Sequence, residues 1–123
     1  MTKIDEILQE VRMELGTEFV STDVVGMDGL SIGGVVLDPN FDATAASARF
    51  AMVMRLAQKV ADKTHMGAVA DGLATTQNIY ILTRFLGDGS YYWSVAVTRE
   101  AVLGMVRMVM EEYADQLWAA IPH

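Results

Sequence analysis

The chain has 123 residues, no cysteine and a formal net charge of −7 at pH 7. That length fits a single domain spanning residues 1–123, and 52% apolar residues supply a core without disulfide bonds. The acidic balance argues against nucleic acids and anionic membranes, which bind basic surfaces, and the missing cysteines exclude thiolate nucleophiles and cysteine-ligated zinc.

The first predicted element is an amphipathic helix from Thr2 to Leu15. Its apolar residues recur at helical spacing and form one stripe, at Ile4, Ile7, Leu8, Val11 and Leu15. Thr2 can cap the first turn, and Gly16 ends the helix. The segment has charges throughout and no signal-peptide core, and no later apolar run approaches the roughly 20 residues that span a bilayer. We therefore expect a cytoplasmic protein.

Residues 19–38 are rich in valine and isoleucine and are predicted to form a β-hairpin. Asp28-Gly29 favours a two-residue type I′ turn, in which both central residues have positive φ. Such a turn places two pairs opposite each other: Met27 with Leu30, and Val25 with Ile32.

The glycines of this hairpin, in the stretch GMDGLSIGG, raise the alternative of a phosphate-binding loop. The Walker and dinucleotide-binding patterns are both absent, and no lysine or arginine occurs between Arg12 and Arg49. We therefore predict a hairpin that binds no nucleotide. Gly33 and Gly34 inside the second strand indicate a bulge or a close backbone approach.

A long helix is predicted from Asp42 or Thr44 to about Lys63. It has two apolar stripes, which are Ala46, Phe50, Val53, Ala57 and Val60, and then Ala45, Ala48, Met52 and Leu56. The clearly polar positions are Thr44, Ser47, Arg55, Gln58 and Asp62. A helix with two apolar sides covers two surfaces, so we expect one stripe on its own sheet and the other on something else.

Three further strands and a last helix complete the chain. The weakest strand, about Val69 to Gln77, is expected at a sheet edge, while residues 79–86 and 91–97 form a hairpin around the loop GDGS. Thr98 is predicted to cap a helix from Arg99 to Leu117. Its inward residues are expected to be Val102, Val106, Val109, Tyr113 and Leu117. The order α-β-β-α-β-β-β-α, with hairpin-linked strands, predicts an antiparallel sheet with helices on both faces.

This order, together with three stretches, resembles the roadblock family of dynein light-chain-type proteins and its bacterial relatives. The stretches are GMDGLSIGG, ATAASARFAMVMRLAQKV, and YILTRFLGDGSYYWSVAV before a last amphipathic helix. The resemblance covers nearly the whole chain. It implies one roadblock-like domain of class α+β, with a five-stranded antiparallel sheet of the roadblock/profilin type.

The resemblance also implies a role without catalytic residues or cofactors. Family members form dimers and regulate or scaffold small GTPases, or link cargo to motors. The bacterial relatives accompany a small Ras-like GTPase in polarity and motility systems, and the best-known kind stimulates its GTP hydrolysis. We therefore expect a homodimeric, non-catalytic regulator or scaffold of a Ras-like GTPase.

Two other function classes stay open. A sheet flanked by helices can enclose a small molecule, and Tyr80, Tyr92 and Trp93 could line such a pocket. A structural dimerisation module without a GTPase partner fits the sequence equally well.

The two histidines, His65 and His123, form no metal-binding pattern. The nine methionines fit a core filler or an adaptable binding surface.

The predicted dimer or partner surface lies on the long helix. Met52 and Leu56 are its expected apolar anchors, and the full set is Ala45, Ala48, Arg49, Met52, Leu56, Lys59 and Lys63. All the arginines are assigned to helices or strands, with Arg99 at a helix start, so an arginine finger from a mobile loop is disfavoured. We expect instead that the protein orders the switch residues of the GTPase by packing against them.

Overall fold

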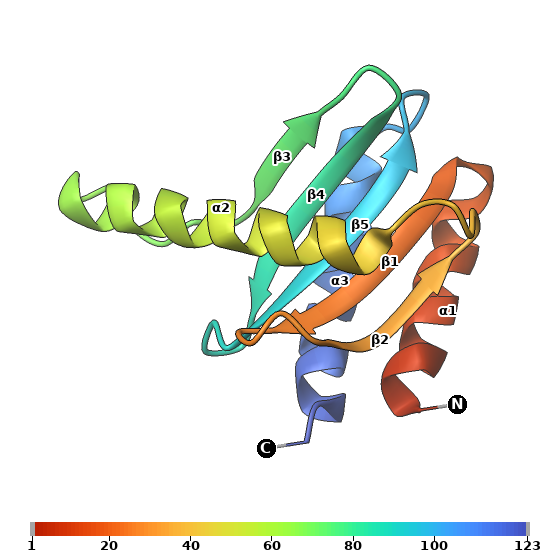
Figure 1. Cartoon of the computed structure of the whole chain (residues 1–123), viewed down its shortest axis with the longest axis horizontal. Coiled ribbons are helices and arrows are strands. Elements are labelled where there is room, and N and C mark those ends of the chain that lie inside the picture. The colour runs from red at the N-terminus through yellow and green to blue at the C-terminus, as the bar shows by residue number, and fades with distance from the viewer. Residues whose placement is uncertain (1, 123) are drawn as a thin grey trace.

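The computed structural model describes residues 2–122 as a five-stranded antiparallel sheet with three α-helices (Figure 1). The elements follow the predicted order: α1 (Lys3–Leu15), a short 3-10 turn (Gly16–Glu18), β1 (Phe19–Gly26), β2 (Ser31–Val36), α2 (Ala43–Lys63), β3 (Gly72–Thr75), β4 (Ile79–Leu86), β5 (Tyr91–Thr98) and α3 (Leu103–Ala120). The strands lie in the order β2-β1-β5-β4-β3, and every neighbouring pair is antiparallel. The predicted fold class is therefore confirmed, and β3 is an edge strand as expected.

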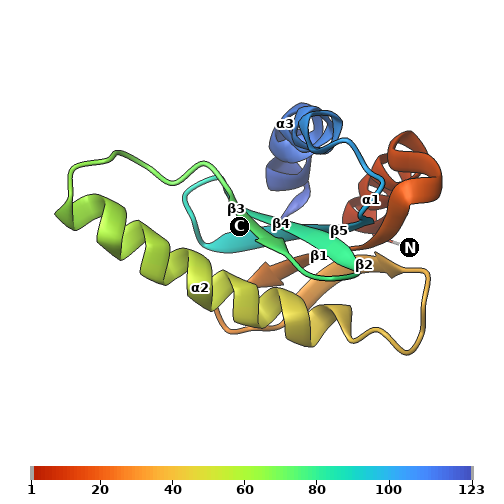
Figure 2. The same cartoon turned by 90° about the horizontal axis from the view of Figure 1, so that it is seen from above.

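The helices form two outer layers around the sheet, with α1 and α3 on one face and α2 on the other (Figure 2). The hydrophobic core lies between the sheet and the α1–α3 layer, and no residue of α2 belongs to it. Trp93 on β5 is fully buried there, and its indole Nε1 donates to the Thr22 hydroxyl at 2.7 Å. The fold is therefore stabilised mainly from the α1–α3 side.

Close backbone approach explains one of the two glycines in β2. A Cβ placed on Gly33 would lie 2.7 Å from the Ile4 side chain, so α1 crosses directly over this strand. Asp5 closes the capping box with Thr2 and also accepts the Gly34 N–H at 3.2 Å. Of the two predicted alternatives, a bulge or a close approach, the close approach is confirmed at Gly33.

The turn of the β1–β2 hairpin differs from the predicted type I′. Only Gly29 has a positive φ, of 83°, and the Gly26 N–H donates to the Leu30 carbonyl at 3.0 Å. The predicted cross-strand pairs are wrong, because a register shift follows Val24, which lies opposite Gly33. The physical reason is the Asp28 carboxylate, which accepts the Leu30 N–H at 3.0 Å and favours a longer loop.

The last helix begins later than predicted. α3 starts at Leu103, and Val102 stands at the N-cap with an exposed side chain. Thr98 does not cap it, because the Thr98 hydroxyl donates to the carboxylate of Glu18 across the sheet. Arg99 therefore lies in the connection between β5 and α3, which corrects its predicted place in a helix. The other four predicted inward residues are buried.

The loop between β4 and β5 provides a matched test of steric packing. Gly87 has a φ of 55°, and a Cβ there would lie 2.2 Å from the Trp118 ring. Gly16 has a similar φ of 65° with nothing within 4 Å of the same position. We expect Gly16→Ala to cost about 1 kcal/mol, from backbone strain alone. Gly87→Ala adds a clash, worth about 1–3 kcal/mol more. Urea unfolding of both variants checks this, and equal losses would contradict it.

Candidate functional site

The long helix α2 rests on the sheet mainly through small side chains, and Met54 is the one large buried residue. Its buried residues are Ala43, Ser47, Ala51, Met54 and Ala61. Neither predicted apolar stripe is this face, and the buried Ser47 came from the positions assigned as polar. The expectation that one stripe covers the sheet is therefore wrong, and the larger apolar side chains of α2 point elsewhere.

The sheet surface beneath α2 explains this orientation, because it is polar. Asp23, Ser94 and Thr83 form a row across β1, β5 and β4 and are each at least 95% buried. The hydroxyls of Thr83 and Ser94 hydrogen-bond each other at 2.9 Å, and Ser31 donates to Asp23 Oδ1 at 2.5 Å. Sequence analysis missed this row, although a charged residue within the strand FVSTDVVG is an available signal.

Asp23 is the one carboxylate in this row, and its environment disfavours the charged form. Burial raises the pKa of Asp23, and the nearby hydroxyls of Ser31 and Thr44 offset this only in part. Its Oδ2 atom has no hydrogen-bond partner among the described residues. An acid whose pKa rises on folding favours the folded state below its ordinary pKa, and that advantage is lost as the pH rises through the folded pKa.

We therefore expect Asp23→Asn to stabilise the protein at neutral pH. The gain is about 1 kcal/mol, since a neutral amide costs less to bury than a carboxylate. It should shrink toward zero as the pH falls to the ordinary pKa of aspartate, because the wild-type side chain is then protonated. Thermal unfolding of both proteins from about pH 3.5 to 8 tests this. A gain that is constant with pH, or a loss at neutral pH, would contradict it.

The outward face of α2 carries a row of large apolar side chains that are exposed. Met52, Val53, Leu56 and Val60 lie along it, each between 51% and 66% exposed. Soluble proteins seldom leave such a row of large apolar side chains in water without a binding partner. The structure thus brings members of both predicted stripes onto one surface, which we call the outer face of α2.

The seven predicted surface residues all lie on the side of α2 away from the sheet. Met52, Leu56, Arg49, Lys59 and Lys63 are exposed or half-exposed. Ala45 and Ala48 are both half-buried, and Ala48 lies beside the tip of the β1–β2 hairpin. The predicted set therefore occupies one continuous surface.

The apolar surface continues from α2 to the edge strand β3. Phe50, Val53 and Leu73 line a small hollow of about 90 Å³ between them, together with residues of β4. Leu73 on β3 is 39% exposed. The outer side of β3 pairs with no other strand of the described chain. An unpaired edge beside an exposed apolar helix face is the arrangement that a second protein surface covers.

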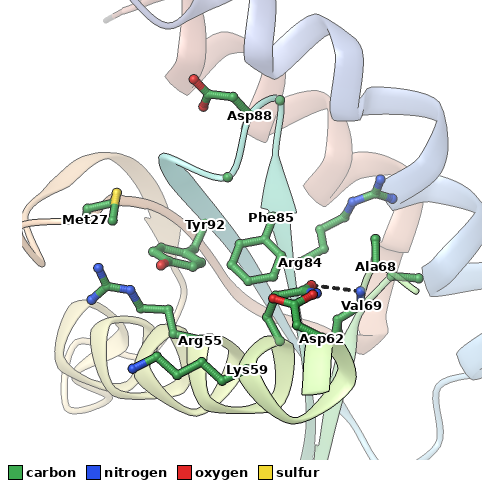
Figure 3. Close-up of a pocket in the computed structure, with 14 residues that line it drawn as sticks. Met27, Arg55, Lys59, Asp62, Ala68, Val69, Arg84, Phe85, Asp88 and Tyr92 are labelled. Carbon is green, nitrogen blue, oxygen red and sulfur yellow. Dashed lines mark hydrogen bonds between the residues drawn. The ribbon is translucent and has the colours of Figure 1, made fainter. Parts of the chain in front are cut away.

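A separate cavity of about 600 Å³ lies between α2, the segment that precedes β3, and the β4–β5 hairpin (Figure 3). Phe85 and Tyr92 form its apolar wall, and Arg55 and Lys59 reach toward it from α2. The backbone N–H of Val69 donates to the Gln58 side chain at its border. This volume is typical of small-molecule sites, so the cavity is a second candidate site.

Only part of the predicted sensing pocket is assembled. Tyr92 lines the cavity, whereas Trp93 is fully buried on the opposite face of the sheet. Tyr80 also faces that side and lies 4.8 Å beneath the guanidinium of Arg99.

Residues 2–122 contain no group of three His, Asp or Glu side chains that could hold a metal. None of the helices in the same range combines the length and apolarity needed to cross a membrane.

Known proteins resemble this chain in fold but not in sequence. No protein-family model and no curated protein matches the sequence. Among solved structures, MglB of Myxococcus xanthus superimposes with a TM-score of 0.84, at 16% identity, over 97% of this chain and 94% of that chain. A Roadblock/LC7 domain from Streptomyces avermitilis gives a TM-score of 0.72, at 18% identity, over 92% and 96%. The chain has a roadblock-type fold.

A third structure with the roadblock-type fold is the gliding protein mglB of Thermus thermophilus. It gives a TM-score of 0.81, at 14% identity, over 96% of this chain and 87% of that chain. The predicted resemblance is therefore confirmed for the fold. Identities this low establish the fold alone. The features that bear on function are therefore the outer face of α2 and the edge of β3.

Proposed function

We propose that the protein is a homodimeric, non-catalytic regulator or scaffold of a small Ras-like GTPase. The observation that carries the proposal is the exposed apolar face of α2 beside the unpaired edge of β3. A second copy that covers the outer face of α2 and the edge of β3 removes a row of apolar side chains from water. It also supplies hydrogen-bond partners to the unpaired backbone groups of β3. A specific dimer of this kind buries roughly 1,200–2,000 Å² in total.

The charges around this face support a second, acidic partner. Arg49, Lys59 and Lys63 lie on α2, and together they are three of only nine Lys and Arg residues in an acidic chain. None of the three forms an ion pair within the described chain. Such a local cationic patch attracts an acidic surface and speeds encounter. The roadblock resemblance implies that this partner is a Ras-like GTPase, in a polarity or motility system.

The proposed mechanism is ordering of the GTPase rather than insertion of an arginine. Arg99 is the one arginine in a connecting segment of residues 2–122, but its guanidinium donates to the Thr76 carbonyl at 2.6 Å and lies over the Tyr80 ring. These contacts hold it against β4, away from α2. A GTPase switch that packs beside the dimer contact, against Arg49, Lys59 and Lys63, loses its mobility, which biases its two-state equilibrium toward the hydrolytic arrangement.

The test requires the Ras-like GTPase that is recovered with the tagged protein from its native cell extract. We expect Lys59→Glu with Lys63→Glu to weaken GTPase affinity at least about tenfold and to reduce its salt dependence. The dimer should remain intact, because both lysines lie outside its apolar centre. Calorimetry at low and high salt gives the affinity, and sedimentation gives the mass.

The control is Lys3→Glu, which makes one charge reversal of the same kind on α1 and should leave affinity unchanged. Unchanged affinity in the double variant, with the dimer preserved, moves the GTPase surface elsewhere. If no GTPase is recovered and the protein is dimeric, the structural dimerisation module becomes the better account.

The cavity beside β4 favours a small-molecule-sensing function as the second candidate. Its lining combines the cations Arg55, Lys59 and Arg84 with the acids Asp62 and Asp88, so a zwitterionic ligand meets both signs of charge there. Saturable binding of a metabolite that is lost in Tyr92→Ala would favour this function over the GTPase role.

A further inference from the structure

A second apolar surface lies on the opposite side of the molecule, between α1 and α3. Two hollows of about 200 and 500 Å³ adjoin there and share Glu14, Met105 and Val109 in their linings. Figure 2 shows the two helices side by side on this face. We call the combined hollow the α1–α3 groove. It is independent of the outer face of α2 and of the proposed GTPase role.

The floor of the α1–α3 groove carries large exposed side chains. Val102, Met105 and Met108 follow one another at three-residue intervals along α3 and are between 60% and 72% exposed. Met105 lines both hollows, Val102 the first and Met108 the second. Methionine is flexible and polarizable, so such a floor adapts to the side chains of a bound helix.

The charged residues that line the groove all have one sign. Both linings contain Glu14, the first adds Glu18 and Glu100, and the second adds Glu111 and Glu112. No lysine, arginine or histidine of the described chain belongs to either lining. Glu111 is paired with Arg84 from β4, which leaves the other four carboxylates without a cation among residues 2–122.

Glu14, which lines both hollows, also accepts a hydrogen bond from a tyrosine of α3. The Tyr113 hydroxyl donates to Glu14 Oε1 at 3.0 Å, which links α3 to α1. Burial, and then Glu14, Glu112 and Glu10, raise the pKa of Tyr113 to about 12. Burial is the largest cause of this shift, and the neighbouring carboxylates add to it.

We propose that the α1–α3 groove binds an amphipathic helix of a partner protein, whose apolar face is flanked by lysine or arginine. The groove lies between two helices, as in helix-in-groove recognition. Its apolar floor matches the apolar face of such a helix, and its glutamate rim matches the basic flanks. An anionic membrane or a nucleic acid is repelled by the same rim.

The probe is a fluorescein-labelled peptide of about 18 residues, leucine and lysine only, with leucine at helical spacing along one face. We expect saturable binding to the full chain, measured by fluorescence anisotropy, that weakens as salt is added. Met105→Ser with Met108→Ser should weaken it at least about tenfold. Met13→Ser is the matched control, because Met13 is 80% exposed on α1 but lines neither hollow, and it should bind as the wild type does.

Charge variants and a scrambled peptide complete the test. Glu100→Gln with Glu112→Gln should reduce the salt dependence of binding. Equal binding by the methionine variant and by Met13→Ser would overturn the proposal. Equal binding of a peptide with the same composition in scrambled order would overturn it too, since charge alone then suffices. A fall in the mass of the protein itself in the methionine variant would show that the groove joins copies of this chain, which also contradicts it.

Discussion

Val53→Glu combined with Leu56→Glu is expected to convert the proposed dimer to a monomer that keeps its fold. Both side chains are more than half exposed on the outer face of α2, so glutamate is accommodated in the monomer. In the dimer each copy would bury two carboxylates without partners. Sedimentation at micromolar concentration, with circular dichroism for the fold, measures both outcomes.

The expected size of this effect follows from the buried area. Burying a valine or leucine side chain is worth about 1.5–3 kcal/mol, and the two-fold interface counts each position twice. The dissociation constant should therefore rise by more than about a thousandfold, since about 1.4 kcal/mol is a factor of ten. Met13→Glu is the control and should remain dimeric. A double variant that stays dimeric would exclude the outer face of α2 from the interface.

Trp93→Ala is expected to give the largest loss of stability among single substitutions. The indole is fully buried in the core between the sheet and the α1–α3 layer. Truncation leaves a cavity and removes the donor to the Thr22 hydroxyl, which itself donates to the Ser94 carbonyl at 2.9 Å. Together these changes cost about 3–5 kcal/mol, a large part of the stability of a small domain.

Urea unfolding followed by circular dichroism gives the loss for Trp93→Ala. Trp118→Ala is the matched control, because that indole is only half-buried at the edge of the same core. It should cost clearly less. A loss below about 1 kcal/mol for Trp93→Ala would show that the α1–α3 side of the sheet does not stabilise the fold.

The elements that sequence predicted well are those with strong local signals. α1 has a single apolar stripe, a threonine cap and a terminal glycine, and its observed bounds agree with the prediction. β4 and β5 alternate regularly around a glycine-rich loop. In these segments the local preference of the residues agrees with the tertiary packing, so the element type and bounds can be predicted from a single sequence.

The orientation of α2 could not be predicted from the helix alone. Its two apolar stripes suggested that one covers the sheet, but the sheet beneath offers Asp23, Ser94 and Thr83. That polar surface accepts the small side chains of α2, and it is assembled from β1 and from the β4–β5 hairpin, which is distant from β1 in sequence. The start of α3 was also predicted wrongly because of a distant residue: Glu18 accepts the hydrogen bond of the Thr98 hydroxyl, which therefore does not cap a helix. The seven predicted surface residues remain a proposal, although the structure places them on one side of α2.

The central claim is that a second copy covers the outer face of α2 and the edge of β3. Hydrogen exchange of the β3 amides at micromolar concentration tests it most directly, with the Val53→Glu, Leu56→Glu variant as the monomeric reference. We predict slow exchange on the outer side of β3 in the wild type, at twice the 13.5 kDa mass of the chain, and fast exchange in the variant. Fast exchange in both proteins, with the wild type sedimenting at 13.5 kDa, would contradict the account.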